Sequence, residues 1–310
     1  FSEEQAMLLD VAREFWRNKS PMASVRAQLE TDTGFDEALW GEMVALGWTG
    51  IALPESCGGS GLGIAAVVTV AEAMGRAMLG TPLLSTTLAA QLLLRSRPGS
   101  EADAVLADIA AGSRTTVALL ENADWGDTGL SCTLAADGVL TGTKKFVADA
   151  EAAALFVVVV EHEGAPALAI VRTEQLAEGA ITANTLIDQT KRSATVEFTG
   201  VTVAPADMVT GPGVASALRD FQLLGALLTA AEATGSAASC LDTIVDYLKT
   251  RKQFGKLIGS YQALKHPAVE ILTQVDASRS FIYHAATLVG EDPLDRDAEI
   301  ACRMAKAQAT

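Results

Sequence analysis

The chain has 310 residues, of which 49% are hydrophobic and 20% are charged, and its formal net charge is −15 at pH 7. This length is enough for two or three domains, and the apolar content is too high for a disordered chain. The acidic balance argues against a surface that binds nucleic acid or an anionic membrane. A local cluster of cations can still bind a small anion, because solvent screens charges beyond about 10 Å.

The spacing of the cysteines and histidines argues against disulfide bonds and bound metal ions. The four cysteines contain no C-x-x-C pair, and the three histidines have no H-x₃-H spacing. We therefore expect neither disulfides nor zinc, and we expect a reducing compartment. The opening "FSEEQAMLLD" is acidic where a signal peptide is basic, and the longest apolar run, "AAALFVVVV", is too short to span a bilayer. A cytoplasmic location is expected.

The first third of the chain is predicted to be helical. Ser2 to Gln5 can form a capping box, and apolar residues then recur at helical spacing from Leu8 to Trp16. Further helices are predicted over residues 36–46, 64–76, 85–95 and 101–111. Four glycines and a proline make "ALPESCGGSGLG" (52–63) a loop. It lacks the G-x-G-x-x-G spacing and a preceding strand, so we expect a connection between helices and not a phosphate site.

From about residue 114 the apolar period changes from 3.6 to 2. Short segments such as "TTVALL", "ALFVVVV", "ALAIV" and "ATVEFTGVTV" are separated by Gly and Asp-Gly turns. Residues 114–204 are therefore predicted to form a small antiparallel β domain. Within it, "LTGTKKFV" is predicted to be a strand whose two lysines lie on a solvated edge.

The remainder of the chain is again helical. Val214 to Lys249 would form a helix about 54 Å long, and Gly255 and Gly259 then interrupt the pattern. Two further helices are predicted over residues 261–289 and 295–310. Helices of this length bury their faces against one another, so a bundle is expected. The sequence thus predicts an α+β chain with three domains: residues 1–113 helical, 114–204 β, and 205–310 a helical bundle.

One segment concentrates positive charge in this acidic chain. "KTRKQFGKLIGSYQALKH" (249–266) contains five cations and no carboxylate. Lys249 is explained by the negative end of the helix dipole. Arg251, near Phe254 and a glycine break, offers a bidentate fork for phosphate oxygens and an apolar face for a flat ring. The residues alone leave open whether a nucleotide-type ligand binds here or whether the cations only complement the helix end.

The same segment resembles the R-x-Q-F-G segment of the acyl-CoA dehydrogenase family. "ALPESCGGSGLG" resembles that family's P-E-x-x-G-G-x-G loop, "LTGTKKFV" its G-x-K-x-[FW]-I strand, and "VTVAPADMV" the segment that leaves its β domain. The order and spacing of these motifs agree over the whole chain. The resemblance implies an N-terminal helical domain, a middle antiparallel β domain and a C-terminal helical bundle, which is shortened here because the chain stops at "RMAKAQAT".

The resemblance also implies a cofactor, a reaction and a set of binding residues. The family uses FAD to desaturate the α,β bond of an acyl-CoA, and its R-x-Q-F-G segment contacts the flavin of a neighbouring subunit. By this resemblance Arg251 would pair with the pyrophosphate of FAD, and Gln253 would hydrogen-bond the same region. Phe254 would pack on the adenosine side, and Ile258 and Tyr261 would line the rest.

Other positions depart from the family's pattern. The flavin-cradling loop, "L-T-E-P-x-A-G-S-D" in the family, corresponds to "LLENADWGD" (119–127). Leu120 replaces a hydroxyl that would contact the flavin, Asn122 replaces proline, and Trp125 replaces a small residue beside the phosphate. The strand after Lys144 ends in Ala148, which has no hydroxyl to donate.

The catalytic base is also not assigned. Some relatives carry a Glu on the first bundle helix about seven turns before R-x-Q-F-G, and that position falls near Gly225. Glu232 is two turns later and is either a base or an ordinary helix carboxylate. Other relatives carry the base further toward the C-terminus.

The intact R-x-Q-F-G segment and the altered loop together predict that this chain works with a second kind of subunit, which has a different role. We expect the chain to be the non-catalytic subunit of an α₂β₂ acyl-CoA dehydrogenase of the actinobacterial steroid side-chain type. It would supply the trans half of the FAD site of a homologous catalytic subunit. The alternatives are a homotetrameric acyl-CoA dehydrogenase with Glu232 as base, and a non-enzymatic scaffold related to the family.

Overall fold

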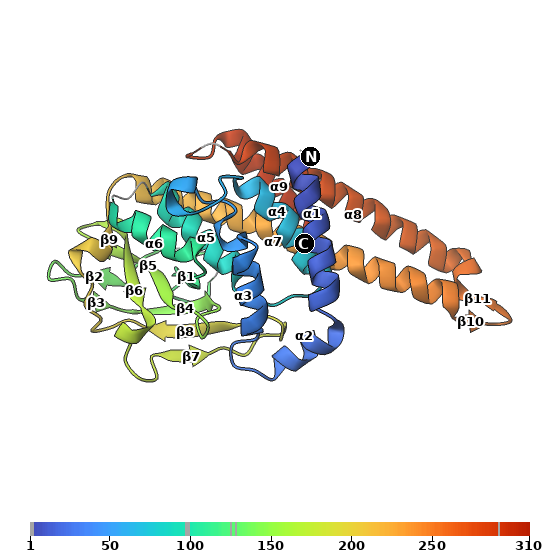
Figure 1. Cartoon of the computed structure of the whole chain (residues 1–310), viewed down its shortest axis with the longest axis horizontal. Coiled ribbons are helices and arrows are strands. Elements are labelled where there is room, and N and C mark those ends of the chain that lie inside the picture. The colour runs from blue at the N-terminus through green and yellow to red at the C-terminus, as the bar shows by residue number, and fades with distance from the viewer. Residues whose placement is uncertain (1–2, 97–99, 125, 128, 291) are drawn as a thin grey trace. The chain divides into compact units, whose positions relative to one another are not determined.

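The computed structural model describes residues 3–96, 100–124, 126–127, 129–290 and 292–310. These residues form two compact units (Figure 1), and each is considered by itself. The helical unit comprises Phe1–Ser24, Ile64–Leu79 and Leu223–Thr310, and the sheet unit comprises Val25–Gly63 and Gly80–Gln222. One helix, α7 (Gly213–Thr250), begins in the sheet unit and continues into the helical unit.

Two β-sheets form the centre of the sheet unit. The larger sheet has the strand order β3–β2–β5–β6–β9, with β1 also paired to β5, and the smaller has the order β4–β8–β7. The strands of the larger sheet are β1 (Thr115–Ala118), β2 (Thr133–Leu134), β3 (Leu140–Thr141), β5 (Leu155–His162), β6 (Ala165–Arg172) and β9 (Met208–Val209). Those of the smaller sheet are β4 (Thr143–Ala148), β7 (Ile181–Ala183) and β8 (Ser193–Glu197).

Strand β5 is buried on both faces. Phe156 and Val158 belong to an apolar cluster shared with the smaller sheet, whereas Val157 and Val159 belong to a second cluster shared with helices α5 (Leu83–Arg95) and α6 (Ser100–Ala110). Successive side chains of a strand point to opposite faces, which explains why this strand is an uninterrupted apolar run in the sequence. The larger sheet is therefore covered by helices on one face and by the smaller sheet on the other.

Short helices precede the strands of the sheet unit. Helix α3 (Glu37–Ala45) begins after Asp36, whose carboxylate accepts hydrogen bonds from the Ala38 and Leu39 amides at 2.8 and 3.2 Å. This N-cap satisfies two amides that the first helical turn leaves unpaired. The 3₁₀ turns η1 (Trp48–Gly50) and η2 (Glu55–Cys57) follow, and residues 58–63 form the predicted loop, which leads to helix α4.

The helical unit is built from α1 (Glu3–Lys19), α4 (Ile64–Arg76), α8 (Gln262–Leu288), α9 (Arg296–Ala309) and the second part of α7. Helices α4 and α7 cross at two glycines. A Cβ atom on Gly75 would lie 1.9 Å from the Glu232 carbonyl oxygen, and one on Gly235 would lie 1.9 Å from the Glu72 carbonyl oxygen. The two helix backbones therefore touch, and a side chain at either glycine would force them apart.

Among the helices in the described part of the chain, α7 alone has the length and hydropathy of a membrane span, and half of its apolar window is buried. Burial of this extent is typical of a core helix of a globular protein.

The structure confirms the predicted helical–β–helical order and the three long C-terminal helices. Two features were not predicted. Helix α2 (Met22–Leu29) buries only Val25, so its sequence has no apolar period to detect. Strands β1 and β2 run parallel to β5, so the antiparallel prediction is wrong for these pairs, since the period of two is the same in both arrangements. The predicted capping box rests on Ser2, which lies outside the described residues.

Candidate functional site

The cationic segment 249–266 forms the end of a long helical hairpin. Helix α7 ends at Thr250 and α8 begins at Gln262, and between them β10 (Lys252–Gln253) pairs with β11 (Lys256–Leu257) in antiparallel register (Figure 1). The backbone amide of Ile258 donates to the Arg251 carbonyl at 2.9 Å, which closes the small hairpin onto the end of α7. The break predicted from the two glycines is therefore an ordered β-turn.

The turn of this hairpin contains an unusual aromatic residue. Phe254 and Gly255 have φ angles of 52° and 76°, as a two-residue primed hairpin turn requires. The left-handed conformation costs a residue with a side chain about 1–2 kcal/mol. The Phe254 side chain is also 90% exposed. Its ring contacts the edge of Tyr261 with a centroid distance of 6.5 Å. Neither the backbone nor the solvent favours phenylalanine here, so a role in recognition explains it better than local stability does.

Arg251 lies at the base of this turn with its side chain exposed. Its backbone amide continues the helix by donating to the Tyr247 carbonyl at 2.9 Å. Its guanidinium forms no hydrogen bond or ion pair with any residue that the structure describes. The five donors of an unpaired guanidinium form a fork that matches a phosphate or carboxylate, so Arg251 is available to an anion from outside this chain.

The remaining predicted binding residues lie in the same loop. The hydroxyl of Tyr261 donates to the Gln253 carbonyl at 3.4 Å, while Ile258 and Tyr261 are half-buried beneath the turn. The structure thus brings Arg251, Gln253, Phe254 and Tyr261 together at one end of the hairpin. Their assignment to FAD still rests on the resemblance of the motif.

The loop that corresponds to the family's flavin cradle is held by a buried ion pair. The ammonium of Lys144, on β4, donates to Glu121 Oε1 at 2.6 Å and to the Leu119 carbonyl at 3.0 Å. Lys144 is fully buried and Glu121 is 8% exposed. The prediction of a solvated edge is therefore wrong for Lys144, because Leu119 and Glu121 lie against its ammonium and Glu121 supplies its counter-ion.

The Glu121 carboxylate accepts hydrogen bonds from several groups besides Lys144. Its other contacts are the amides of Ser131 and Cys132, at 2.7 and 3.0 Å, and the Ser131 hydroxyl. Burial acts to raise the pKa of Glu121, but the hydrogen bonds from Lys144, Ser131 and Cys132 outweigh it and hold the pKa below its usual value. Burial lowers the pKa of Lys144, with Glu121 opposing the shift, and raises the pKa of the Cys132 thiol to about 11. The ion pair and these hydrogen bonds tie Glu121 to β4 and to Ser131 and Cys132.

Asn122, Asp124 and Asp127 use their side chains for hydrogen bonds within the described part of this loop. Asn122 donates to Asp127 at 2.7 Å, and its own oxygen accepts from the Asp124 amide at 2.7 Å. The carboxylates of Asp124 and Asp127 accept from the Gly126 and Gly129 amides at 2.9 and 2.8 Å. Hydrogen bonds from Gly129 and Asn122 lower the pKa of Asp127, which keeps its negative charge. A phosphate would meet carboxylates and engaged amides, so these residues do not fit a diphosphate.

Strand β4 also differs from a flavin-contacting strand. Its pairing with β8 is irregular between Lys144 and Val147, and Phe146 within this bulge has a φ of 53°. Ala148 is exposed and presents no side-chain donor, and its carbonyl accepts the Thr116 hydroxyl at 2.6 Å. The hydroxyl of Thr116 is thus engaged and does not replace the missing one. Trp125, the third departure in this region, lies outside the described residues.

A pocket of about 430 Å³ lies beside the loop in the sheet unit. Leu119, Leu130, Val159 and Leu218 form apolar walls, and Arg219 supplies a cation. Its volume and mixed lining are within the range of small-molecule sites. Glu232 does not line this pocket and belongs to the helical unit. Glu161 is the carboxylate among its lining residues, and it accepts a hydrogen bond from the Gly164 amide at 2.6 Å. The geometry of this loop contact does not assign it as the base that the resemblance requires.

Comparison with known proteins shows the family. Residues 2–113 match the N-terminal domain of acyl-CoA dehydrogenases, and residues 211–310 match their C-terminal domain. Acyl-CoA dehydrogenase IpdE2 of Mycobacterium tuberculosis is 30% identical over 290 residues, which cover 91% of this chain and 76% of the relative. The chain belongs to the acyl-CoA dehydrogenase family, which consists of FAD-dependent oxidoreductases, as the four sequence motifs predicted.

Solved structures agree with this assignment. The ChsE4–ChsE5 complex from Mycobacterium tuberculosis is 26% identical with a TM-score of 0.86, covering 99% of this chain and 82% of that one. A variant of the Tcur3481–Tcur3483 steroid ACAD is 27% identical with a TM-score of 0.82 and the same coverage. Butyryl-CoA dehydrogenase from Megasphaera elsdenii, 22% identical with a TM-score of 0.84 over 100% of this chain and 84% of that one, shares the fold.

Proposed function

We propose that this chain is a subunit of an FAD-dependent acyl-CoA dehydrogenase and supplies the trans half of the FAD site of a partner subunit. The partner is a homologous catalytic chain in an α₂β₂ assembly, and the substrate is an acyl-CoA, in particular a steroid side-chain thioester. The proposal includes a cytoplasmic location and the division into domains at residues 1–113, 114–204 and 205–310. It is carried by the contrast between Arg251, whose guanidinium has no partner among the described residues, and Asn122, Asp124 and Asp127, whose side chains already bind neighbouring amides or one another.

The end of the helical hairpin fits the diphosphate and adenosine of FAD. Arg251 would pair with the pyrophosphate, Gln253 would hydrogen-bond beside it, and Phe254 would pack on the adenosine. Ile258 and Tyr261 would support the turn. When bound, FAD supplies the acceptor for the hydride that leaves the acyl chain. The residues of this chain would bind and orient it from outside.

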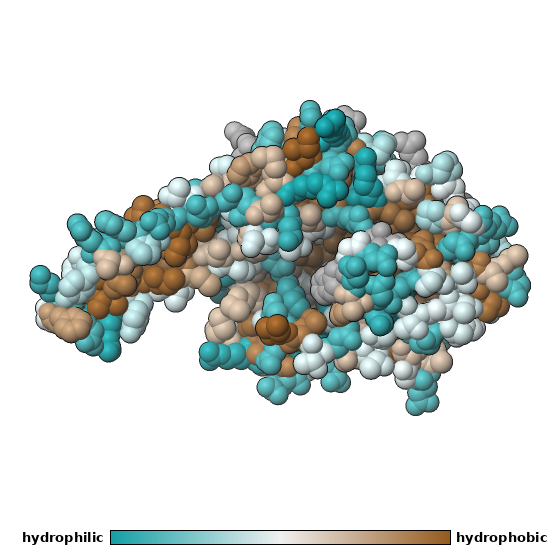
Figure 2. Space-filling model, turned by 180° about the vertical axis from the view of Figure 1, so that it is seen from behind, coloured by the Kyte–Doolittle hydropathy of each residue, from teal (hydrophilic) through white to brown (hydrophobic). Residues whose placement is uncertain are grey.

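The hairpin surface also suits a partner chain. Apolar side chains lie along the hairpin (Figure 2), and the large exposed ones between α7 and the first half of α8 are Ile244, Tyr247, Phe254, Leu257, Leu264, Val269, Ile271 and Leu272. A contiguous apolar surface of this kind is typical of a protein–protein interface. The two similar structures with titles that name a pair of chains, ChsE4–ChsE5 and Tcur3481–Tcur3483, support a heteromeric assembly.

The first test measures flavin per chain. The chain is purified alone and together with a candidate catalytic partner, and bound FAD is quantified by absorbance against protein concentration. The proposal predicts almost no FAD in the lone chain and one FAD per pair of unlike chains in the complex. A full complement of one FAD for each lone chain would refute it.

The second test concerns Arg251. Loss of a charge-assisted phosphate contact costs about 1.5–3 kcal/mol, which corresponds to roughly 10- to 150-fold weaker FAD binding by the complex. Arg251→Ala should therefore lose FAD on dilution or gel filtration. The matched control is Lys249→Ala, since this cation is explained by the helix end and should leave FAD binding unchanged. Equal retention of FAD by both variants would remove Arg251 from the site.

One observation favours a second function, that of a complete acyl-CoA dehydrogenase with its own active site. The 430 Å³ pocket beside loop 119–132 offers apolar walls to an acyl chain. In that case the lone chain would bind FAD and dehydrogenate acyl-CoA. Glu232, which does not line this pocket, is the base only if Glu232→Gln abolishes turnover while FAD stays bound. If neither the lone chain nor the complex dehydrogenates any acyl-CoA, the scaffold hypothesis replaces both.

A further inference from the structure

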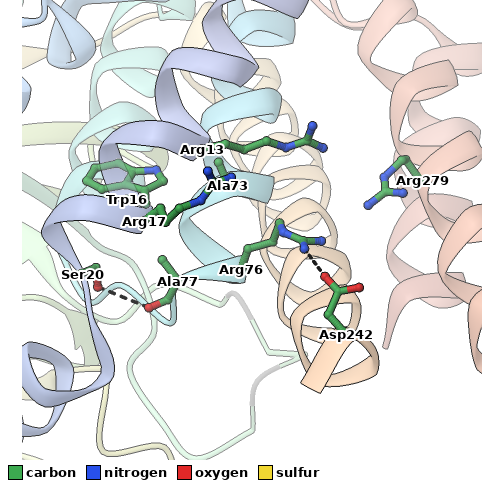
Figure 3. A pocket seen from close by; sticks show the side chains of 9 residues that line it. All are labelled: Arg13, Trp16, Arg17, Ser20, Ala73, Arg76, Ala77, Asp242 and Arg279. Carbon is green, nitrogen blue, oxygen red and sulfur yellow. Dashed lines mark hydrogen bonds and ion pairs between the residues drawn. The ribbon is translucent and has the colours of Figure 1, made fainter. Parts of the chain in front are cut away.

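The helical unit contains a second cationic feature, separate from the hairpin end. A pocket of about 540 Å³ is lined by residues of α1, α4, α7 and α8 (Figure 3). Its lining contains four arginines and a single carboxylate: Arg13, Arg17, Arg76, Arg279 and Asp242. In a chain of net charge −15, this local excess of positive charge has no general cause. The segment 249–266 contributes nothing to this pocket.

Two of the arginines share one buried carboxylate. Glu72 is 1% exposed, and its Oε1 accepts from Arg279 Nε and Nη2 at 3.0 and 2.8 Å. Arg13 reaches the same oxygen at 4.0 Å, and the Tyr283 hydroxyl donates to the other oxygen at 2.6 Å. Burial acts to lower the pKa of Arg279, but the bonds and charge of Glu72 reverse this, so the guanidinium stays charged. The carboxylate of Glu72 therefore neutralises only one of the two guanidiniums beside it, and its hydrogen bonds fix the position of Arg279 in the pocket wall.

The other two arginines, Arg76 and Arg17, are not bound by a buried carboxylate among the residues described. Arg76 pairs with Asp242, but both side chains are partly exposed, and such a pair contributes about 0–1 kcal/mol. Arg17 forms no ion pair with any residue in the described part of the chain. Two further carboxylates, Asp10 and Asp276, lie outside the lining, at 4.0 Å from Arg13 and 3.6 Å from Arg279. Both are mostly exposed, so solvent screens their charge.

The side chains are arranged to meet a ligand between the helices. Figure 3 shows Arg13 and Arg76 extending from one side toward Arg279 on the opposite helix. The ring of Trp16 and the methyl groups of Ala73 and Ala77 complete the wall. The lining holds four guanidinium groups and one carboxylate, and converging guanidiniums repel one another, so an anion between them would stabilise the folded chain. Arginine forks bind phosphate oxygens in pairs.

We infer that this pocket binds a small molecule that carries a diphosphate group. Three converging guanidiniums match the charge of a diphosphate better than that of a single phosphate. The volume of about 540 Å³ leaves room for an attached organic group, which the Trp16 ring and the alanines would contact. Arg279, fixed by Glu72, orients the ligand, and Arg13, Arg17 and Arg76 close on it. Occupation would join α1, α4, α7 and α8 and stabilise the helical unit.

The test uses the purified full chain and inorganic pyrophosphate, with orthophosphate for comparison, measured by calorimetric titration and by the rise in melting temperature. Pyrophosphate should bind saturably and at least tenfold more tightly than orthophosphate. The double variant Arg13→Gln/Arg76→Gln should bind it at least tenfold more weakly. The control is Arg303→Gln on α9, which removes one positive charge outside the pocket and should bind as the wild type does. If the double variant does not fold, Arg17→Gln replaces it, with an expected loss of several-fold.

A variant of the hairpin end separates this inference from the proposed FAD site. Arg251→Ala should leave pyrophosphate binding unchanged, since Arg251 does not line the pocket. The inference is overturned if pyrophosphate shows no saturable binding, or if Arg303→Gln weakens it as much as the pocket variants do. It is also overturned if Arg251→Ala abolishes binding while Arg13→Gln/Arg76→Gln retains it, which would place the anion at the hairpin end.

Discussion

Replacement of Lys144 by methionine should destabilise the sheet unit strongly. Methionine keeps the length and apolar character of the lysine stem, so packing is conserved and the loss is confined to the ammonium. The change removes the 2.6 Å contact to Glu121 and the 3.0 Å bond to the Leu119 carbonyl, both in a buried environment. A carboxylate and a carbonyl are left without their buried partner.

The expected magnitude is about 3 kcal/mol in the free energy of unfolding. Breaking a buried ion pair by removal of one partner costs about 3–5 kcal/mol. The lower end applies because Glu121 keeps the Ser131 and Cys132 amides and the Ser131 hydroxyl. In the Lys144→Met background, Glu121→Gln should recover about 1 kcal/mol, because it removes the uncompensated charge and keeps an oxygen for those donors.

Urea unfolding followed by tryptophan fluorescence measures this loss, since Trp40 and Trp48 lie in the same unit as Lys144. The control is Lys145→Met, one residue further along β4, where the side chain is exposed and a change within about 0.5 kcal/mol is expected. The reasoning is refuted if the two variants are equally stable, or if adding Glu121→Gln to Lys144→Met destabilises the protein further.

Three further predictions follow from the described contacts. Gly75→Ala should cost several kcal/mol in unfolding free energy, because its Cβ would lie 1.9 Å from the backbone of α7; Gly41→Ala, with nothing within 4 Å, should be neutral or stabilising by up to about 1 kcal/mol. A thiol reagent at pH 8 should label exposed Cys240 and leave Cys132, with a pKa of about 11, unlabelled; rapid labelling of Cys132 would contradict its burial. The pKa of Glu121 is lowered in the folded state, so its contribution is present at neutral pH and lost as pH falls below about 4.3. Acid titration of Glu121→Gln should therefore show a shallower loss of stability than the wild type, and parallel curves would contradict the shift.

Much of the architecture follows from local sequence patterns. The change of apolar period near residue 114 and its reversal near residue 213 mark the strands and the long helices, because side-chain burial has a period of 2 in a strand and 3.6 in a helix. The glycines at 255 and 259 mark the break between α7 and α8. The concentration of cations in the segment 249–266 is visible without any structure. The family motifs add the expected cofactor, and comparison with known proteins confirms the family.

Three properties depended on the tertiary structure, because each joins residues that are distant in sequence. The burial of Lys144 depends on Glu121 folding over β4, and a strand's sequence does not reveal what covers it. The parallel pairing of β1 and β2 with β5 depends on how the chain connects these strands. The two-residue apolar period does not reveal it, because the period is the same in parallel and antiparallel pairs. The four arginines of the second pocket come from three segments, residues 13–17, 76 and 279, and only the packing of α1, α4 and α8 around α7 places them together. The sequence by itself determined that positive charge is concentrated in the segment 249–266. Only the fold decided that arginines from three distant segments meet in one pocket, because that meeting depends on how the helices pack.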